Sequence, residues 1–161
     1  MYKRQDIEKA KPNLWIWSGD CVYVDSPNKE VITRKFEFQY NNPNYKAFRD
    51  KVPIIGTWDD HDFGENNSGK WFQSKELTQE KFLDFLDEPQ DSQRRHRKGV
   101  YTNYTFGPAG KQVKILLLDN RYHADIPGPD GDLPGNVQWS WLENELANSR
   151  SQIHLIVSGT Q

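Results

Sequence analysis

Three short apolar runs in this chain each stop at a loop that carries aspartate. The runs are residues 14–17, 52–58 and 113–118, and the loops are 18–20, 59–62 and 119–121. Runs of about four to eight apolar residues that end at turn residues are typical of buried strands. In an open α/β sheet, functional groups collect on the loops that leave the carboxyl ends of the strands. The sequence therefore predicts a sheet that brings acidic loops together at one edge.

Helical patterns separate these strands. The polar and aromatic composition of residues 27–50 suggests short helices that cover an edge of the sheet. Thr78 is expected to cap a helix with one apolar face, and Pro89 to stop it. Apolar residues at helical spacing predict an amphipathic helix from Val137 to about Asn148. Strands that alternate with helices favour an α/β architecture.

The second half of the chain supplies the remaining elements. Residues 101–106 alternate aromatic and polar side chains and, with 113–118, predict a hairpin. The segment 125–135 is dense in Pro, Gly and Asp, which indicates an irregular surface loop. Residues 153–157 predict a final strand, and the basic run 94–98 is expected to be a solvated loop. The pair Trp139 and Trp141 is expected in the core.

Length, charge and cysteine content exclude several classes of protein. A chain of 161 residues fits one domain, and its net charge of −2, with acids and bases interspersed, predicts no nucleic-acid-binding surface. No apolar run approaches the ~20 residues that span a bilayer, so no transmembrane segment is expected. The single cysteine, Cys21, excludes an internal disulfide and a zinc site of several thiolates, and we expect an inert buried thiol.

The acidic loops contain the residues that a site for hard metal ions needs. Carboxylates near a His and a Tyr suit divalent or trivalent cations that prefer oxygen ligands. Asp20, on a turn that Gly19 allows, can bridge two ions at the ~3.5–4 Å separation used for hydrolysis at phosphorus. Tyr23 can bind one of these ions through its phenolate, and Asp60 the other. His61 can donate a hydrogen bond to a phosphoryl oxygen or protonate the leaving group.

Four phrases in this order resemble the alkaline phosphatase D (PhoD-like) family. They are Gly-Asp-x-x-Tyr at 19–23, Trp-Asp-Asp-His-Asp-Phe at 58–63, Leu-Leu-Asp-Asn-Arg-Tyr at 117–122, and the helix phrase at 138–146. The first phrase is shared with purple acid phosphatases, whereas the second is similar to the PhoD-like family, because purple acid phosphatases have an Asn where Asp60 stands. The phrases cover most of the chain from residue 12 onwards.

The resemblance implies a metal-dependent phosphoester hydrolase, either a phosphatase or a phosphodiesterase, in which a metal-activated hydroxide attacks a phosphate ester substrate. It implies an α/β fold that is part of a two-sheet sandwich flanked by helices, with iron and calcium as the metal ions. The residues that match the family's motifs are Asp20, Tyr23, Asp59 and Asp60 as metal ligands, His61 as the catalytic residue and Arg121 as a phosphate contact.

Several alternatives stay open at this stage. The resemblance implies that residues 1–161 form a partial PhoD-like domain whose upstream and downstream ligand loops are absent. An inactive fragment, or a non-catalytic metal-binding domain of the same fold, is therefore the alternative function. Tyr23 alone could be a half-buried aromatic residue, and Arg121 could simply be the ion-pair partner of Asp119. Neither the oligomeric state nor the compartment follows from these residues, although an extracytoplasmic location would fit if an N-terminal signal has been lost.

Overall fold

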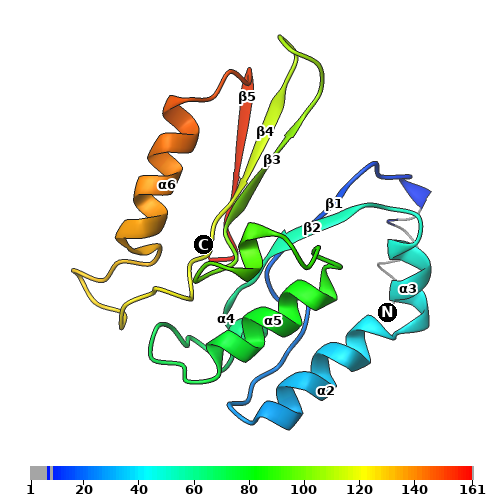
Figure 1. Cartoon of the computed structure of the whole chain (residues 1–161). Coiled ribbons are helices and arrows are strands. Elements are labelled where there is room, and N and C mark those ends of the chain that lie inside the picture. Colours follow the sequence, from blue (N-terminus) through cyan, green and yellow to red (C-terminus); the bar gives the residue numbers. More distant parts are fainter. Residues whose placement is uncertain (1–6, 8, 161) are drawn as a thin grey trace.

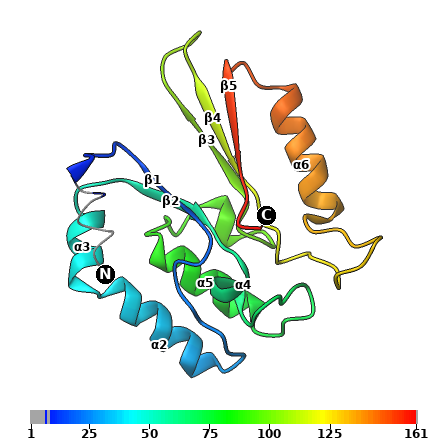
Figure 2. The same ribbon diagram turned by 180° about the vertical axis from the view of Figure 1, so that it is seen from behind.

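Two small β-sheets lie face to face in the middle of the structure, a computed structural model that describes residue 7 and residues 9–160 (Figures 1 and 2). In the first sheet, β1 (Trp15–Ser18) and β2 (Ile54–Thr57) run parallel. In the second, β3 (Thr102–Phe106), β4 (Val113–Leu117) and β5 (Ile153–Val157) lie in that order. The β3–β4 pair is the predicted antiparallel hairpin, and β5 runs parallel to β4.

Apolar residues of both sheets meet between them. Ile55 of β2 packs against Ile115 and Leu117 of β4, with Ile16 of β1 beside them. Because side chains alternate along a strand, the neighbouring Trp17 and Ile54 face the opposite side, where helices cover the sheet. The predicted α/β sandwich of two sheets flanked by helices is confirmed.

The helices that cover the first sheet are α2 (Lys29–Tyr40), α3 (Pro43–Arg49) and α5 (Lys75–Phe85). The side chains of Asn28 and Asn42 accept hydrogen bonds from the first turns of α2 and α3, which explains where these helices begin. The prediction that Thr78 caps α5 is wrong. Ser74 precedes the helix, whereas Thr78 is buried inside it and its hydroxyl donates to the Ser74 carbonyl.

The helix α6 (Gly135–Ala147) covers the outer face of the second sheet, as both ribbon views show (Figures 1 and 2). Leu142 of α6 packs on Leu116 and Leu118, and Trp141 lies 4.9 Å from the ring of Tyr101. Trp139 does not join this core, contrary to the sequence prediction. It is 44% exposed because it lies on the outer side of α6 and donates its indole N–H to Asp132.

The basic run 94–98 is not a uniformly solvated loop. Arg94, in the short helix η1 (Gln93–Arg95), is only 1% exposed. Its guanidinium lies 2.9 Å from the Glu88 carboxylate and donates to the backbone carbonyls of Val100 and Gly56. Arg94 therefore links β2 to the segment that precedes β3. This contact could not be seen in the sequence, because it joins residues up to 38 positions apart.

The carboxyl ends of β1, β2, β4 and β5 all lie at the same end of the sandwich. Within each sheet these strands run parallel, and the two sheets are joined there by a 2.5 Å hydrogen bond from the Thr57 hydroxyl to the Leu118 carbonyl. The loops that leave these strands, at 19–25, 59–64, 119–123 and 158–160, therefore converge. No helix in the described part of the chain is long and apolar enough to cross a membrane.

Candidate metal centre

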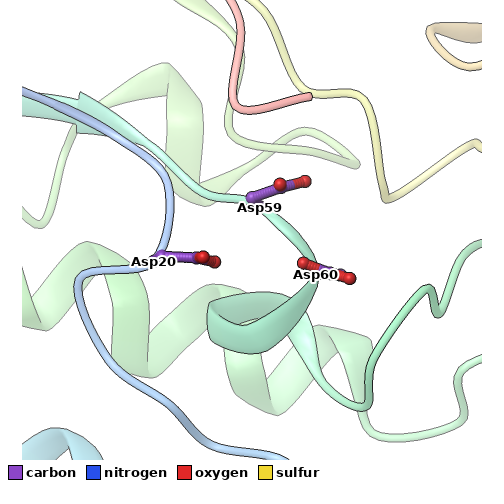
Figure 3. Close-up of side chains that lie close together, drawn as sticks. All are labelled: Asp20, Asp59 and Asp60. Carbon is purple, nitrogen blue, oxygen red and sulfur yellow. The ribbon is translucent and has the colours of Figure 1, made fainter. Parts of the chain in front are cut away.

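Three aspartates from the first two acidic loops come together at this end of the sandwich. Asp20 follows β1, Asp59 follows β2, and Asp60 begins the single-turn helix α4 (Asp60–Phe63). One carboxylate oxygen of each lies within 4.8 Å of the other two, and Figure 3 shows the three side chains around a common space. An all-oxygen donor set of this kind matches the preference of hard cations.

Gly19 permits this close approach of the two loops. Its φ of +100° is in the left-handed region, and a Cβ at this position would lie 2.6 Å from the Cβ of Asp59. The next residue, Asp20, also has a positive φ, of 52°. The Gly-Asp pair therefore turns the chain sharply at the end of β1 and places the carboxylate of Asp20 beside the second loop.

The buried carboxylate of Asp62 connects the loop that follows β1 to the loop that follows β2. Asp62 is fully buried, and its carboxylate accepts hydrogen bonds from the backbone N–H groups of Val22 at 2.6 Å and Asp59 at 3.1 Å. The thiol of Cys21 lies 3.0 Å from the same carboxylate. Burial raises the pKa of Asp62 to about 6 and also raises the pKa of Cys21, so the thiol stays protonated and acts as a donor.

Asp60 is kept ionised by its surroundings. Burial by itself would raise the pKa of this carboxyl group. The backbone N–H of Asn67, 2.7 Å away, and the nearby charge of Arg121 outweigh burial and lower the pKa below its ordinary value. The second oxygen accepts the backbone N–H of His61 at 3.1 Å. Asp60 is thus a fixed anion at the start of α4.

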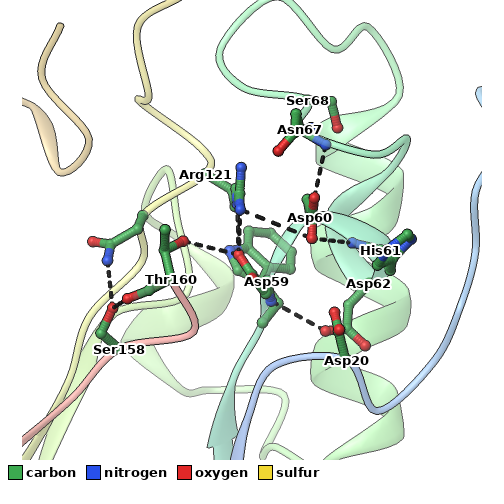
Figure 4. A network of polar contacts seen from close by, with 12 residues as sticks. Asp20, Asp59, Asp60, His61, Asp62, Asn67, Ser68, Arg121, Ser158 and Thr160 are labelled. Carbon is green, nitrogen blue, oxygen red and sulfur yellow. Dashed lines mark hydrogen bonds and ion pairs between the residues drawn. The ribbon is translucent and has the colours of Figure 1, made fainter. Parts of the chain in front are cut away.

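Arg121 contacts the carboxylates of Asp59 and Asp60 in the candidate metal site (Figure 4). Its Nε and Nη2 lie 2.7 and 2.6 Å from the same oxygen of Asp59, and Nη2 lies 3.8 Å from Asp60. The alternative that Arg121 is the ion-pair partner of Asp119 is wrong. The guanidinium of Arg121 contacts Asp59 and Asp60, whereas the carboxylate of Asp119 accepts hydrogen bonds from other groups.

Asp119, the aspartate of the third acidic loop, has a structural role. It is fully buried and accepts hydrogen bonds from the Trp58 indole at 2.8 Å and from the backbone N–H groups of Val100, Arg121 and Tyr122. These bonds shape the loop that presents Arg121. The three acidic loops thus converge as predicted, but only two of them supply the carboxylates of the cluster.

Tyr23 and His61 lie side by side at the rim of the cluster. Their ring centroids are 4.6 Å apart, and the Tyr23 hydroxyl donates to Asp20 at 3.2 Å. Tyr23 is 53% exposed. His61 contacts the carboxylate of Asp25 through Nδ1, and this hydrogen bond raises the pKa of His61.

Sequence reasoning missed several residues of this network. Thr160 donates to Asp59 at 2.9 Å, and Ser158 accepts from the side-chain amide of Asn120 at 2.7 Å. The carbonyl oxygen of Asn120 is buried and has no hydrogen-bond partner among the described residues. Ser158 and Thr160 could have been suspected, because they follow a strand parallel to β4. Asp25 offered no comparable signal beyond lying in the same loop as Asp20.

The charge of the site favours a bound cation. Five aspartates, at positions 20, 25, 59, 60 and 62, lie in the two loops, and among the described residues Arg121 and His61 are the basic groups whose side chains contact them. Carboxylates this close repel one another unless positive charge neutralises them. The residues of the cluster, by charge and by ligand type, therefore fit hard metal ions.

Comparisons with known proteins give the same assignment as the motifs. The model of the PhoD-like phosphatase family matches residues 33–161, which include Asp59, Asp60, His61 and Arg121. A solved structure of PhoD superposes with a TM-score of 0.70 over 95% of this chain, at 21% sequence identity.

A curated relative is one component of the nuclease SbcCD from Staphylococcus epidermidis. It is 32% identical to this chain over 88 residues, a match that covers 53% of this chain. The chain spans 22% of that relative's length and 37% of the solved PhoD chain. Since the family model covers most of its residues, this chain belongs to the PhoD-like phosphatase family, whose members are metallophosphoesterases.

Proposed function

We propose that this chain carries part of the active site of a metal-dependent phosphoester hydrolase, acting as a phosphatase or a phosphodiesterase. The observation that carries this proposal is the cluster of Asp20, Asp59 and Asp60 oxygens within 4.8 Å of one another, beside Arg121 and His61. A phosphate ester is anionic, so a site built of carboxylates alone would repel it. Bound cations reverse that repulsion and leave the arginine to contact the ester.

In this proposal Asp20, Asp59 and Asp60 hold the metal ions, with Tyr23 as a further ligand, and the ions are iron and calcium. When bound, such ions neutralise charge that develops on phosphorus and supply a nucleophile at neutral pH. Asp20, whose carboxylate lies close to those of Asp59 and Asp60, would be the bridging ligand if two ions bind. Asp20 raises the pKa of Tyr23, and a cation beside both groups would reverse that effect.

The residues of the chain have separate tasks in the reaction. Arg121 uses Nε and Nη2 for Asp59, which leaves Nη1 to orient a phosphoryl oxygen. As the attacking oxygen bonds to phosphorus, the bond from phosphorus to the ester oxygen breaks, and His61 donates a proton to that leaving oxygen. The hydrogen bond to Asp25 raises the pKa of His61, which favours the protonated imidazole that a general acid requires.

The substrate is a phosphomonoester or a phosphodiester. The likeness to part of a nuclease keeps phosphodiesters among the substrates to be tested, because a nuclease cleaves phosphodiester bonds.

A second function, a metal-binding domain without turnover or an inactive fragment, is favoured by one specific observation. The chain matches 37% of the solved PhoD chain, and we propose that residues 1–161 are a partial domain whose remaining ligand loops lie elsewhere. Three carboxylates and a tyrosine could then bind an ion without completing the catalytic arrangement.

The experiment that separates these functions is hydrolysis of a chromogenic phosphomonoester and a chromogenic phosphodiester with iron and calcium supplied. The wild-type chain is compared with Asp60→Ala and His61→Ala, and with Asp87→Ala, which removes a 58% exposed carboxylate that contacts Tyr40 and Arg49. Turnover that is lost in the first two variants and retained in the third supports the hydrolase. Metal binding without turnover in the wild-type chain selects the non-catalytic domain.

A further inference from the structure

Asp25 contacts the one histidine of the site, although no motif in the sequence points to it. Its carboxylate meets Nδ1 of His61. The side chain of His61 is 25% exposed and that of Asp25 is 45% exposed, so the pair lies at the mouth of the site and not within the core. The other ring nitrogen, Nε2, is thereby left for a ligand.

Backbone contacts hold Asp25 in this place. The N–H of Val24 donates to the carbonyl of His61 at 2.9 Å, and the N–H of Val22 donates to the Asp62 carboxylate at 2.6 Å. Val24 is only 1% exposed, so the residue before Asp25 is anchored in the core. Two hydrogen bonds from the residues just before Asp25 therefore hold its segment against the segment that carries His61.

The conformation of Asp25 also limits which residues fit there. Its φ of 48° lies in the left-handed region, which Gly, Asn and Asp adopt more readily than other residues. This backbone conformation turns the chain after Val24. Asn and Gly are consequently the replacements that test the carboxylate without forcing a new backbone.

The ring of His61 is restrained from a second direction. Tyr23 lies with its centroid 4.6 Å away and its plane tilted by 34°. Contact with Asp25 at one edge and with Tyr23 on a face leaves the imidazole little freedom to rotate. A carboxylate that accepts the proton of one ring nitrogen decides which tautomer the neutral imidazole adopts.

We propose that Asp25 is a positioning residue that accepts a hydrogen bond from Nδ1 of His61 and so directs Nε2 toward the leaving oxygen of the substrate. This inference rests on the proposed role of His61 in phosphoester hydrolysis. It adds a residue that does not touch the substrate itself. A histidine without such an acceptor would distribute its neutral form over both tautomers and several ring orientations.

The test combines a measurement on the ring with one on turnover. The tautomer of neutral His61 is read by ¹⁵N NMR, at a pH above its titration, in the wild-type chain, Asp25→Gly, Asp25→Asn and the control Asp87→Asn. Gly removes the carboxylate, and Asn keeps its shape without its charge. The same four proteins are assayed for kcat and KM with the chromogenic esters.

The expected result is an Nδ1–H tautomer in the wild-type chain and in Asp87→Asn, and loss of that preference in Asp25→Gly, with Asp25→Asn between them. We expect kcat to fall about 10- to 100-fold in Asp25→Gly while KM stays within about twofold. A tautomer population that is the same in wild type and Asp25→Gly overturns the inference, and so does an unchanged kcat. If the wild-type chain shows no turnover, the proposed hydrolase activity fails, while the tautomer still decides whether Asp25 positions His61.

Discussion

The guanidinium of Arg121 and the carboxylate of Asp59 join loops that are 62 residues apart, through two contacts of 2.7 and 2.6 Å to one oxygen. The pair connects the end of β4 to the end of β2, so it ties the two sheets together where the candidate site lies. It also places positive charge where a metal ion would bind. In the proposed site, Arg121 and a bound ion would neutralise the same carboxylates.

This relationship predicts how Arg121→Ala depends on metal. In metal-free protein the change leaves Asp59 and Asp60 without their cationic partner, and we expect the free energy of unfolding to fall by about 2–4 kcal/mol. With calcium present the loss should shrink, because the ion takes over the neutralisation. Urea denaturation with EDTA and with calcium measures both values. Arg95→Ala, which removes the ion pair with Asp84 and hydrogen bonds to the Glu88 and Pro89 carbonyls away from the site, is the control, and its loss of stability should be the same with EDTA and with calcium. If Arg121→Ala lowers the free energy of unfolding by the same amount with and without calcium, Arg121 and calcium do not neutralise the same carboxylates.

Gly19 should not tolerate a side chain. Gly19→Ala places a Cβ 2.6 Å from the Cβ of Asp59 and also strains a φ of +100°. Gly110 has a φ of +81° and nothing within 4 Å of its position, so Gly110→Ala measures the conformational cost alone, about 1–2 kcal/mol. We expect Gly19→Ala to lose more stability than this and to weaken metal binding as well. If Gly19→Ala and Gly110→Ala lose the same stability, the loop of Gly19 does not lie against the loop of Asp59.

The buried Glu88–Arg94 ion pair predicts that one conservative substitution, Glu88→Gln, lowers the free energy of unfolding strongly. Glu88→Gln leaves the guanidinium of Arg94, 1% exposed, without its counter-charge, which costs about 3–5 kcal/mol. Asp84→Asn, which removes the partner of Arg95 at a 44% exposed position, should cost less than about 1 kcal/mol. Chemical denaturation of the two variants checks the difference. If Glu88→Gln and Asp84→Asn both lose less than about 1 kcal/mol of stability, the guanidinium of Arg94 is in contact with water and not buried.

Much of the fold follows from local patterns, because β1, β2, β4 and β5 are apolar runs followed by a loop with Gly or Asp, and β3 alternates aromatic and polar side chains. The start of α5 did not follow from local patterns, since Ser74 and Thr78 are both residues that can cap a helix. Both are buried in the fold, and the helix begins directly after Ser74, with Thr78 inside it. Trp139 lies only two positions from Trp141, but residues two apart on a helix point in different directions, so only Trp141 reaches the core.

The candidate site was predictable where its residues share a loop with a motif. Asp20, Asp59 and Asp60 come together because parallel strands end at one edge. The partner of Arg121 was not predictable, since sequence proximity favoured Asp119 and the fold offers Asp59 from the other sheet. Contacts between loops of different sheets depend on how the sheets pack, which a single sequence does not display.

Tyr45 predicts a loss of stability at alkaline pH. Its ring stacks on Phe85 at 4.9 Å, and burial raises the pKa of its hydroxyl above the ordinary value near 10. Above about pH 10 the unfolded chain releases this proton and the folded chain retains it, so the stabilisation present below that pH is lost as pH rises. The expected slope is up to ~1.4 kcal/mol per pH unit. Unfolding of Tyr45→Phe should have a correspondingly smaller slope between pH 10 and 11. Identical slopes would contradict the burial of this hydroxyl.

The most direct test of the account is calorimetric titration of metal-free protein with calcium and, separately, with iron. The wild-type chain is compared with the double variant Asp20→Asn, Asp60→Asn and with Asp87→Asn, whose carboxylate lies among surface contacts to Tyr40 and Arg49. The account predicts saturable binding to the wild-type chain and to Asp87→Asn, and at least a tenfold loss of affinity, about 1.4 kcal/mol, in the double variant. Equal affinities in all three proteins would contradict a metal centre at Asp20, Asp59 and Asp60.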